Sequence, residues 1–477
     1  MNKKTVLIII ALLAIAAITV GCTENYKQNP IGGNYDNKEI FSNGGMAVKY
    51  GDYLYFINGY AAKDDKNNFG DVVKGAIMRV ELDDNGKPKL STLVTVVPKK
   101  VYSTDKEYGG LFIVNDYIYY STTSMEKDSE GNPKTDKMVI MRTKVNGADT
   151  EIIAEFDSHS IKYKVINNSL VYVKDNNIYR INLTDKKFAA KKVDEGIDST
   201  FFYTRPLKDS NSMDNYIFYS KTDSQTGKKT IKVAAIEGDF KKDIFTSDDM
   251  GDDAIYTATI IDIKYYEEKI TVFYNITDNK PTTPSAGIYS YTYDTNFNFI
   301  KSNLIRYTNN PTSTEGFGYS KFYYLEGKVL AFGSGKNESD QTVSKMDIFS
   351  LTGDKEGNAV TFNGTVVIED IFFEEGENQG YYIYYSEGNK YYKMKLFDMV
   401  DGSIQPAGGN ASLYYDGAFT STWIKSEVID NVLYFFNADV SDNIFYLDLD
   451  AVKERDAESR KPRVLGVITD EDRIAAF

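Results

Sequence analysis

The chain has 477 residues, a formal net charge of −14 at pH 7, one cysteine and one histidine. Such an acidic chain repels the phosphates of nucleic acids and anionic lipid head groups, so nucleic acid is not an expected partner. The single Cys22 excludes a disulfide framework and a thiolate metal cluster. The single His159 excludes a three-histidine zinc site, and we expect no cofactor.

A targeting segment opens the chain. Two lysines precede an apolar run over residues 6–20, which has the length of a secretory h-region and falls short of the ~20 residues needed to cross a bilayer. The small Gly21 directly before Cys22 resembles the bacterial lipobox. That resemblance implies a signal peptide over residues 1–22, a diacylated Cys22 and a location at the extracytoplasmic face of the cell membrane. An uncleaved anchor, or cleavage elsewhere, is the alternative.

Residues 23–42 are predicted to be a flexible tether. Asn, Lys, Gly and Pro dominate this stretch, and it has no apolar periodicity. A segment of that composition buries too little surface to offset the entropy of ordering it. The folded domain is therefore expected over residues 43–477.

A short phrase recurs eight times along this domain: one or two turn residues, then an alternating apolar and aromatic strand. From Leu54 to Leu433 the seven intervals between repeats average about 54 residues, a period typical of solenoids and propellers. One aliphatic residue stands at the centre of each repeat: Leu54, Ile118, Val171, Ile217, Ile270, Val329, Ile383 and Leu433.

A second strand phrase follows each of these repeats. In the third repeat only Asp175, Asn176 and Asn177 separate the two phrases, and such residues tolerate the positive φ of a tight hairpin. Further strand-like runs flank the hairpin, as at residues 93–97 and 152–156. Four strands per repeat predict an all-β propeller with eight blades. Seven blades are the next choice, and a sandwich array or a β-solenoid is the alternative architecture.

The run Ile-Tyr-Arg-Ile-Asn-Leu at residues 178–183, followed by a polar turn, resembles the YWTD-like and TolB-like propellers of bacterial surface lipoproteins. Repeat by repeat, the resemblance covers residues 51 to about 449, and it implies the fold but no activity. Residues 463–468 are a candidate closing strand beside residues 46–49. Residues 450–460 are the one plausible helix.

Few patterns along the chain carry chemistry. His159 is expected to lie in a turn, and no G-x-S-x-G elbow occurs. Residues 333–336 lack the upstream glycine of a phosphate-binding loop. Two oxygen-rich clusters are candidate Ca²⁺ loops, but neither has the spacing of an EF-hand loop, and solvated turns between strands are the preferred explanation. The acidic candidates are Asp248, Asp249, Asp252 and Asp253, and then Asp83, Asp84, Asn85 and Gly86. The loop aromatics that could line a binding face are Tyr60, Phe69, Phe317, Tyr319, Tyr414 and Tyr415.

Three functions fit these observations. The first is a membrane-tethered binding or scaffold protein for a protein or a cell-envelope polysaccharide, without catalytic residues. The second is a carbohydrate-active enzyme, a lyase or glycosidase, that uses Asp, Glu and Tyr. The third, a solute-binding lipoprotein of a transporter, needs two α/β lobes, and the helix signal for them is missing.

Overall fold

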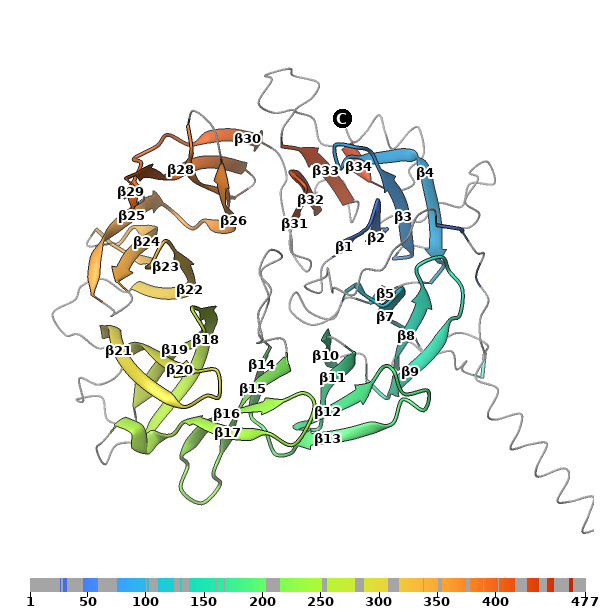
Figure 1. The fold of residues 1–477 in the computed structure, drawn as a ribbon, viewed down its shortest axis with the longest axis horizontal. Coiled ribbons are helices and arrows are strands. Elements are labelled where there is room, and N and C mark those ends of the chain that lie inside the picture. Colours follow the sequence, from blue (N-terminus) through green and yellow to red (C-terminus); the bar gives the residue numbers. More distant parts are fainter. Residues whose placement is uncertain are drawn as a thin grey trace, which may run out of the picture. The chain divides into compact units, whose positions relative to one another are not determined.

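The computed structural model describes residues 26, 29–31, 46–58, 75–99, 101–102, 110–123, 129–130, 137–158, 161–166, 168–202, 215–250, 255–278, 287–307, 317–337, 339–350, 354–374, 378–388, 390–401, 403–416, 427–436, 444–449 and 463–465. None of these residues belongs to a helix that is long and apolar enough to cross a membrane. The chain divides into two compact units, whose strands are labelled in Figure 1. Unit 1 holds residues 1–172, 181–190 and 421–477, and unit 2 holds residues 173–180 and 191–420.

Three complete sheets belong to unit 1. The first sheet has the order β1-β2-β3-β4 (Ala47–Tyr50, Tyr53–Ile57, Ile77–Leu82, Pro88–Val97). The second has the order β5-β7-β8-β9 (Val101–Tyr102, Tyr117–Thr123, Met138–Lys144, Glu151–Phe156), with β6 (Phe112–Val114) also paired to β7. The eighth has the order β31-β32-β33-β34 (Glu427–Ile429, Val432–Phe436, Ile444–Asp448, Arg463–Leu465).

The residues of the third sheet are divided between the two units: β10 (Lys162–Ile166), β11 (Ser169–Lys174), β12 (Asn177–Asn182) and β13 (Ala190–Asp194). Unit 2 holds four further sheets in chain order. The fourth contains β14–β17 (Ser199–Phe202, Tyr216–Thr222, Lys229–Ala235, Lys241–Phe245). The fifth contains β18–β21 (Tyr256–Tyr266, Lys269–Asp278, Gly287–Asp294, Phe299–Tyr307). The sixth contains β22–β25 (Phe317–Leu325, Lys328–Lys336, Thr342–Ser350, Lys355–Asn363). The seventh contains β26–β30 (Val367–Glu374, Gly380–Glu387, Lys390–Val400, Ser403–Pro406, Ser412–Asp416).

These eight antiparallel sheets are the blades of a β-propeller, which confirms the predicted fold class and the predicted blade number. All eight central aliphatic residues of the repeat lie in the second main strand of a blade, and none is more than 5% exposed. The flanking runs at residues 93–97 and 152–156 lie in β4 and β9. The period therefore reflects one buried strand per blade.

Tight hairpins set the register within the blades. Asp175 and Asn176 have φ values of 50° and 58° and join β11 to β12, as predicted. Two consecutive left-handed residues form the turn whose twist matches the twist of the strands it joins. Asn115-Asp116 and Asp430-Asn431 form the same kind of turn between the first and second strands of their blades.

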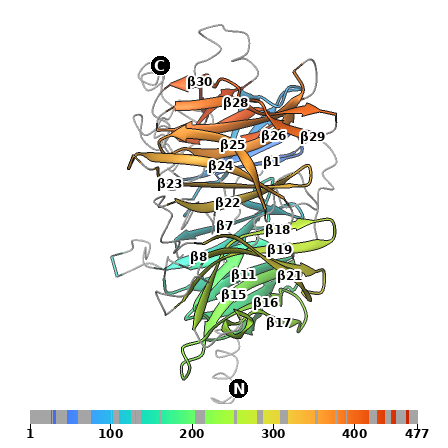
Figure 2. The ribbon, with the colours of Figure 1, turned by 90° about the vertical axis from the view of Figure 1, so that its left-hand side faces the viewer.

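Apolar side chains fill the space between neighbouring blades. In unit 2 one cluster joins the fourth and fifth blades through Phe218 and Val272, another joins the fifth and sixth through Phe273 and Phe322, and a third joins the sixth and seventh. The rings of Phe273 and Phe322 stack at 4.0 Å between centroids. Figure 2 shows these sheets of unit 2 lying face to face. Stacked blades bury the faces that a single sheet would expose.

The first and eighth blades, both in unit 1, pack on each other at what we call the seam. One apolar cluster contains Leu54 and Met78 from the first blade and Val432, Tyr434 and Leu465 from the eighth. In Figure 1 the blue β1–β4 and the red β31–β34 lie side by side. Side chains, and no shared sheet, hold the two ends of the described chain together at this point.

The predicted closing strand is correct in position but wrong in its pairing. β34 forms within residues 463–468, yet it pairs with β33 of its own blade, and β1 pairs with β2. The first and eighth blades each complete a four-stranded sheet from strands that are contiguous in sequence, so neither takes a strand from the other end of the described chain. The predicted helix at residues 450–460 lies outside the described residues.

Candidate functional site

A polar groove of about 970 Å³ opens at the seam, within unit 1. One wall comes from the first blade and the other from the turn between β31 and β32 of the eighth blade. The lining residues are Lys49, Gly51, Asp52, Tyr53, Glu81, Leu82, Asp83, Asp84, Asn85, Gly86, Lys89, Asp430 and Asn431. The groove therefore brings the predicted oxygen-rich turn at residues 83–86 against residues that lie far along the chain.

Local hydrogen bonds shape the turn at residues 83–86. The Asp83 carboxylate accepts hydrogen bonds from the N–H groups of Asn85 and Lys87, each at 2.9 Å. Gly86 has a φ of 75°, and a Cβ there would lie 2.9 Å from the Cβ of Asp430. A side chain at Gly86 would thus meet both a strained backbone and the opposite wall. Glycine at this position allows the two walls to approach.

The groove carries an excess of negative charge. Five carboxylates line it, from Asp52, Glu81, Asp83, Asp84 and Asp430, against two lysines, Lys49 and Lys89. Lys49 already forms an ion pair with Asp430 across the seam. Beside the groove, Lys87 pairs with Asp448 of the eighth blade. Such a surface favours a ligand with hydroxyl and cationic groups.

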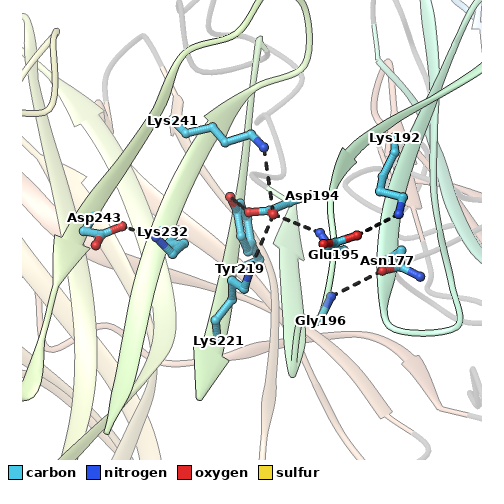
Figure 3. Close-up of polar contacts among 10 residues, drawn as sticks. All are labelled: Asn177, Lys192, Asp194, Glu195, Gly196, Tyr219, Lys221, Lys232, Lys241 and Asp243. Carbon is cyan, nitrogen blue, oxygen red and sulfur yellow. Dashed lines mark hydrogen bonds and ion pairs between the residues drawn. The ribbon is translucent and has the colours of Figure 1, made fainter. Parts of the chain in front are cut away.

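A second polar cluster joins the third and fourth blades inside unit 2 (Figure 3). Asp194, at the end of β13, accepts hydrogen bonds from the Tyr219 hydroxyl at 2.5 Å and from the Glu195 N–H at 2.9 Å. The ammonium groups of Lys221 and Lys241 lie 3.4 and 3.8 Å from the same carboxylate. The Asp194 side chain is only 14% exposed. This carboxylate is thus surrounded by partners that stabilise its charge.

These partners shift the pKa values of Asp194 and Tyr219. Burial alone would raise the pKa of Asp194, but the hydrogen bonds from Tyr219 and Glu195 and the two lysine charges hold it below its ordinary value. Burial, and then the hydrogen bond to Asp194, raise the pKa of Tyr219. Both shifts favour the ionised carboxylate beside a neutral tyrosine. The arrangement links two blades and leaves Asp194 ionised at neutral pH.

Tyr319 was a candidate loop aromatic, and that prediction is wrong. It lies in β22, is 7% exposed, and its hydroxyl donates to the Asp347 carboxylate at 2.5 Å. Lys355 and Asn358 contact the same carboxylate at 2.9 and 3.0 Å. Burial would raise the pKa of Asp347, but these three partners lower it. The cluster connects β22, β24 and β25 inside the sixth blade and offers no binding surface.

Other predicted residues also lie in regular structure. Phe317 belongs to β22, and Tyr414 and Tyr415 belong to β30, so none of them is a loop residue. Residues 333–336 form the end of β23 and make no phosphate loop. Asp248 pairs with Lys228, and Asp249 accepts a hydrogen bond from the Thr246 N–H at the start of a 3₁₀ turn. Among the described residues, no group of three or more His, Cys, Asp or Glu side chains could hold a metal ion. The remaining candidates, Cys22, Tyr60, Phe69, His159, Asp252 and Asp253, lie outside the described residues.

The sequence alone pointed to one wall of the groove and missed the other. Asp430 and Asn431 are the turn residues at the start of the eighth repeat, and the sequence gives no sign of a further role for them. Their place opposite residues 83–86 depends on the packing of the last blade on the first. Asp194 and Tyr219 were missed as well, because a carboxylate at a strand end gives no local signal of a partner in the next blade.

No protein-family model matches this sequence, and a search of characterised proteins found no relative. Among solved structures, the chain is similar to dipeptidyl peptidase 4 of Porphyromonas gingivalis, with a TM-score of 0.46 and 10% identity over 91% of this chain and 60% of that chain. It is also similar to the β-propeller domain of the Trilobed protease from Pyrococcus furiosus, with a TM-score of 0.36 and 13% identity over 76% of this chain and 99% of that domain. A third is an oligogalacturonate lyase from Vibrio parahaemolyticus, with a TM-score of 0.36 and 8% identity over 82% of this chain and 94% of that enzyme. The chain spans 60% of the length of the peptidase, and likenesses this distant say nothing about activity.

Proposed function

We propose that this chain is a lipid-anchored protein of the extracytoplasmic membrane face that binds a protein or a cell-envelope polysaccharide, without turning it over. The observation that carries the binding role is the polar groove at the seam, with five carboxylates and two lysines. The lipid anchor rests on Cys22, which follows an apolar run and a small residue in the manner of a lipobox. Two acyl chains give the stable anchoring that a single chain does not.

The charge of the groove limits which chemical groups its ligand should carry. Its carboxylates favour amino groups, such as those of an amino-sugar polymer or of lysine and arginine side chains. Its polar turns offer N–H and C=O groups to hydroxyls. We therefore expect a polysaccharide that bears free amines to bind more tightly than the same polymer with its amines acetylated.

Isothermal titration calorimetry of the full chain with a glucosamine oligomer and its N-acetylated counterpart tests this proposal. Asp84 is an exposed groove carboxylate, and Asp84→Asn should weaken binding of the amine form about tenfold, which is typical of losing a hydrogen bond to a charged group. Asp239→Asn is the control, because it makes the same charge change at an exposed side chain of unit 2. Equal binding by both variants and the parent chain would contradict a ligand site in the groove.

A carbohydrate-active enzyme is the second candidate, favoured by the same cluster of groove carboxylates. Glycosidases need two carboxylates on either side of the scissile bond. The two proposals predict different products from one incubation with cell-envelope polysaccharide. A binding protein leaves the polymer intact and bound, whereas an enzyme releases shorter fragments, and Asp84→Asn or Glu81→Gln would then abolish that release.

A further inference from the structure

Residues near the proposed anchor are attached to the first two blades of unit 1. The Asn29 N–H donates to the carbonyl of Asn146 in the second blade at 2.8 Å. The Asn29 side-chain amide donates to the carbonyl of Thr95, in β4 of the first blade, at 2.9 Å. One residue of the predicted tether is thus hydrogen-bonded to two different blades.

A buried arginine completes this attachment. Arg79, in β3, is 5% exposed, and its guanidinium donates to the carbonyls of Asn29 and Pro30, each at 3.2 Å. It also approaches the carbonyl of Val145 at 3.5 Å and lies over the Tyr53 ring at 4.8 Å. A buried guanidinium needs partners for its N–H groups, and its planar fork can hold two carbonyls at once. Two of its three carbonyl partners come from residues 29 and 30.

Apolar contacts support the polar ones. Tyr26 and Ile31 are partly buried against the core between the first and second blades, which contains Tyr53, Val96 and Val145. The described part of this segment therefore has apolar contacts as well as hydrogen bonds. We call Tyr26 and residues 29–31 the strap.

We propose that the strap holds the edge formed by β4 and the Asn146 turn against the membrane, so that this edge faces lipid head groups. The inference rests on the proposed lipid anchor at Cys22. Tyr26 is the fourth residue after Cys22, so the two Cα atoms lie at most about 14 Å apart. If the strap were free, the stretch from Cys22 to Met46, which has 23 residues in between, could span up to about 80 Å. Docking of the strap thus converts a long tether into a short one.

Energy transfer on vesicles tests this orientation. Ser91 is exposed on β4, and a Ser91→Cys substitution provides one labelling site in the full, lipidated chain because an acylated Cys22 has no free thiol. The acceptor is a head-group dye in neutral phosphatidylcholine vesicles. The double substitution Asn29→Ala with Ile31→Ser removes contacts that the strap makes with the blades. Arg79→Lys removes the guanidinium that binds the Asn29 and Pro30 carbonyls. Pro30→Ala is the control, since it removes an exposed ring and keeps the carbonyl that Arg79 binds.

We expect transfer in the parent and in Pro30→Ala to be at least twofold higher than in both weakened variants, with all four bound to vesicles and folded by circular dichroism. Equal transfer in all bound variants would overturn the strap while the lipid anchor stands. Parent protein that is no more vesicle-bound than Cys22→Ser would overturn the anchor, and with it the orientation. Hydrogen exchange then separates the two failures, because a docked strap protects the Asn29 N–H even in an unanchored chain.

Discussion

Tyr319 and Tyr434 are both buried, but only the first has a partner for its hydroxyl among the described residues. Tyr319 donates to the buried Asp347 carboxylate. Tyr434, which is fully buried at the seam, has no hydrogen-bond partner for its hydroxyl in the described part of the chain. A buried polar group that lacks a partner costs free energy, whereas one bonded to a charge stabilises the fold.

Replacing each tyrosine by phenylalanine should therefore give opposite results in urea unfolding. Tyr319→Phe should lower the free energy of unfolding by about 2 kcal/mol, because it leaves the Asp347 carboxylate short of a donor. Tyr434→Phe should raise it by about 1 kcal/mol, because it removes an unsatisfied hydroxyl and keeps the ring. Tyr381→Phe, at a more exposed hydroxyl that donates to Glu326, is the control and should change little. Loss of stability in Tyr434→Phe would reveal a partner for that hydroxyl.

Asp194 makes the stability of unit 2 depend on pH. Its pKa is lower in the folded chain than its usual value near 3.9 in an unfolded one. The stability it contributes is therefore complete above that usual value and is lost as the pH falls through the folded pKa. Asp194→Asn should lower the thermal midpoint at pH 7, and the difference from the parent should shrink as the pH falls below about 4. Asp239→Asn, at a carboxylate of unit 2 that is 98% exposed, should reproduce neither effect. A constant difference between Asp194→Asn and the parent across pH would contradict this account.

At the scale of the strand, sixth-blade packing requires a glycine. A Cβ at Gly333 of β23 would lie 2.0 Å from the carbonyl oxygen of Gly318 in β22. No described atom lies within 4 Å of a Cβ placed on Gly318 itself. The two strands approach closely beside Tyr319, which pairs with Gly333 in the register.

Gly333→Ala should therefore destabilise the chain by about 3 kcal/mol, because the backbone of β22 must move to admit a methyl group. Gly318→Ala is the matched control and should change the free energy of unfolding by less than about 0.5 kcal/mol. Guanidinium unfolding of the two variants measures the difference. Equal stability would show that the strands separate at little cost.

Strands and turns were largely predictable from the sequence, because their signals are local. The aliphatic residue of each repeat, such as Leu54, marks a buried strand, and the Asp175-Asn176 pair marks a tight hairpin. Partners in different blades gave no such signal. The contact of Gly86 with Asp430 and the bond from Tyr219 to Asp194 depend on how blades pack. Tyr319 was misplaced because a strand rich in aromatic and polar residues was interpreted as a loop.

At the scale of the whole chain, each described blade is a contiguous stretch of sequence, and the neighbouring blades within a unit meet through side chains. This organisation explains why the blade number could be counted from the repeat. It also explains the wrong pairing of the closing strand, since no blade borrows a strand from the other end of the chain. The groove exists because the last blade meets the first, so its two walls are about 340 residues apart in sequence.

The seam also has a consequence for synthesis. The face of the first blade that contains Leu54 and Met78 is covered by Val432 and Tyr434, which are made roughly 350 residues later. At about 5 to 20 residues per second, that apolar face waits for roughly 20 to 70 seconds before its partner exists. During this interval the nascent chain exposes an apolar surface with which other chains can associate. Whatever accompanies this protein from the ribosome must shield its beginning until its end has been made.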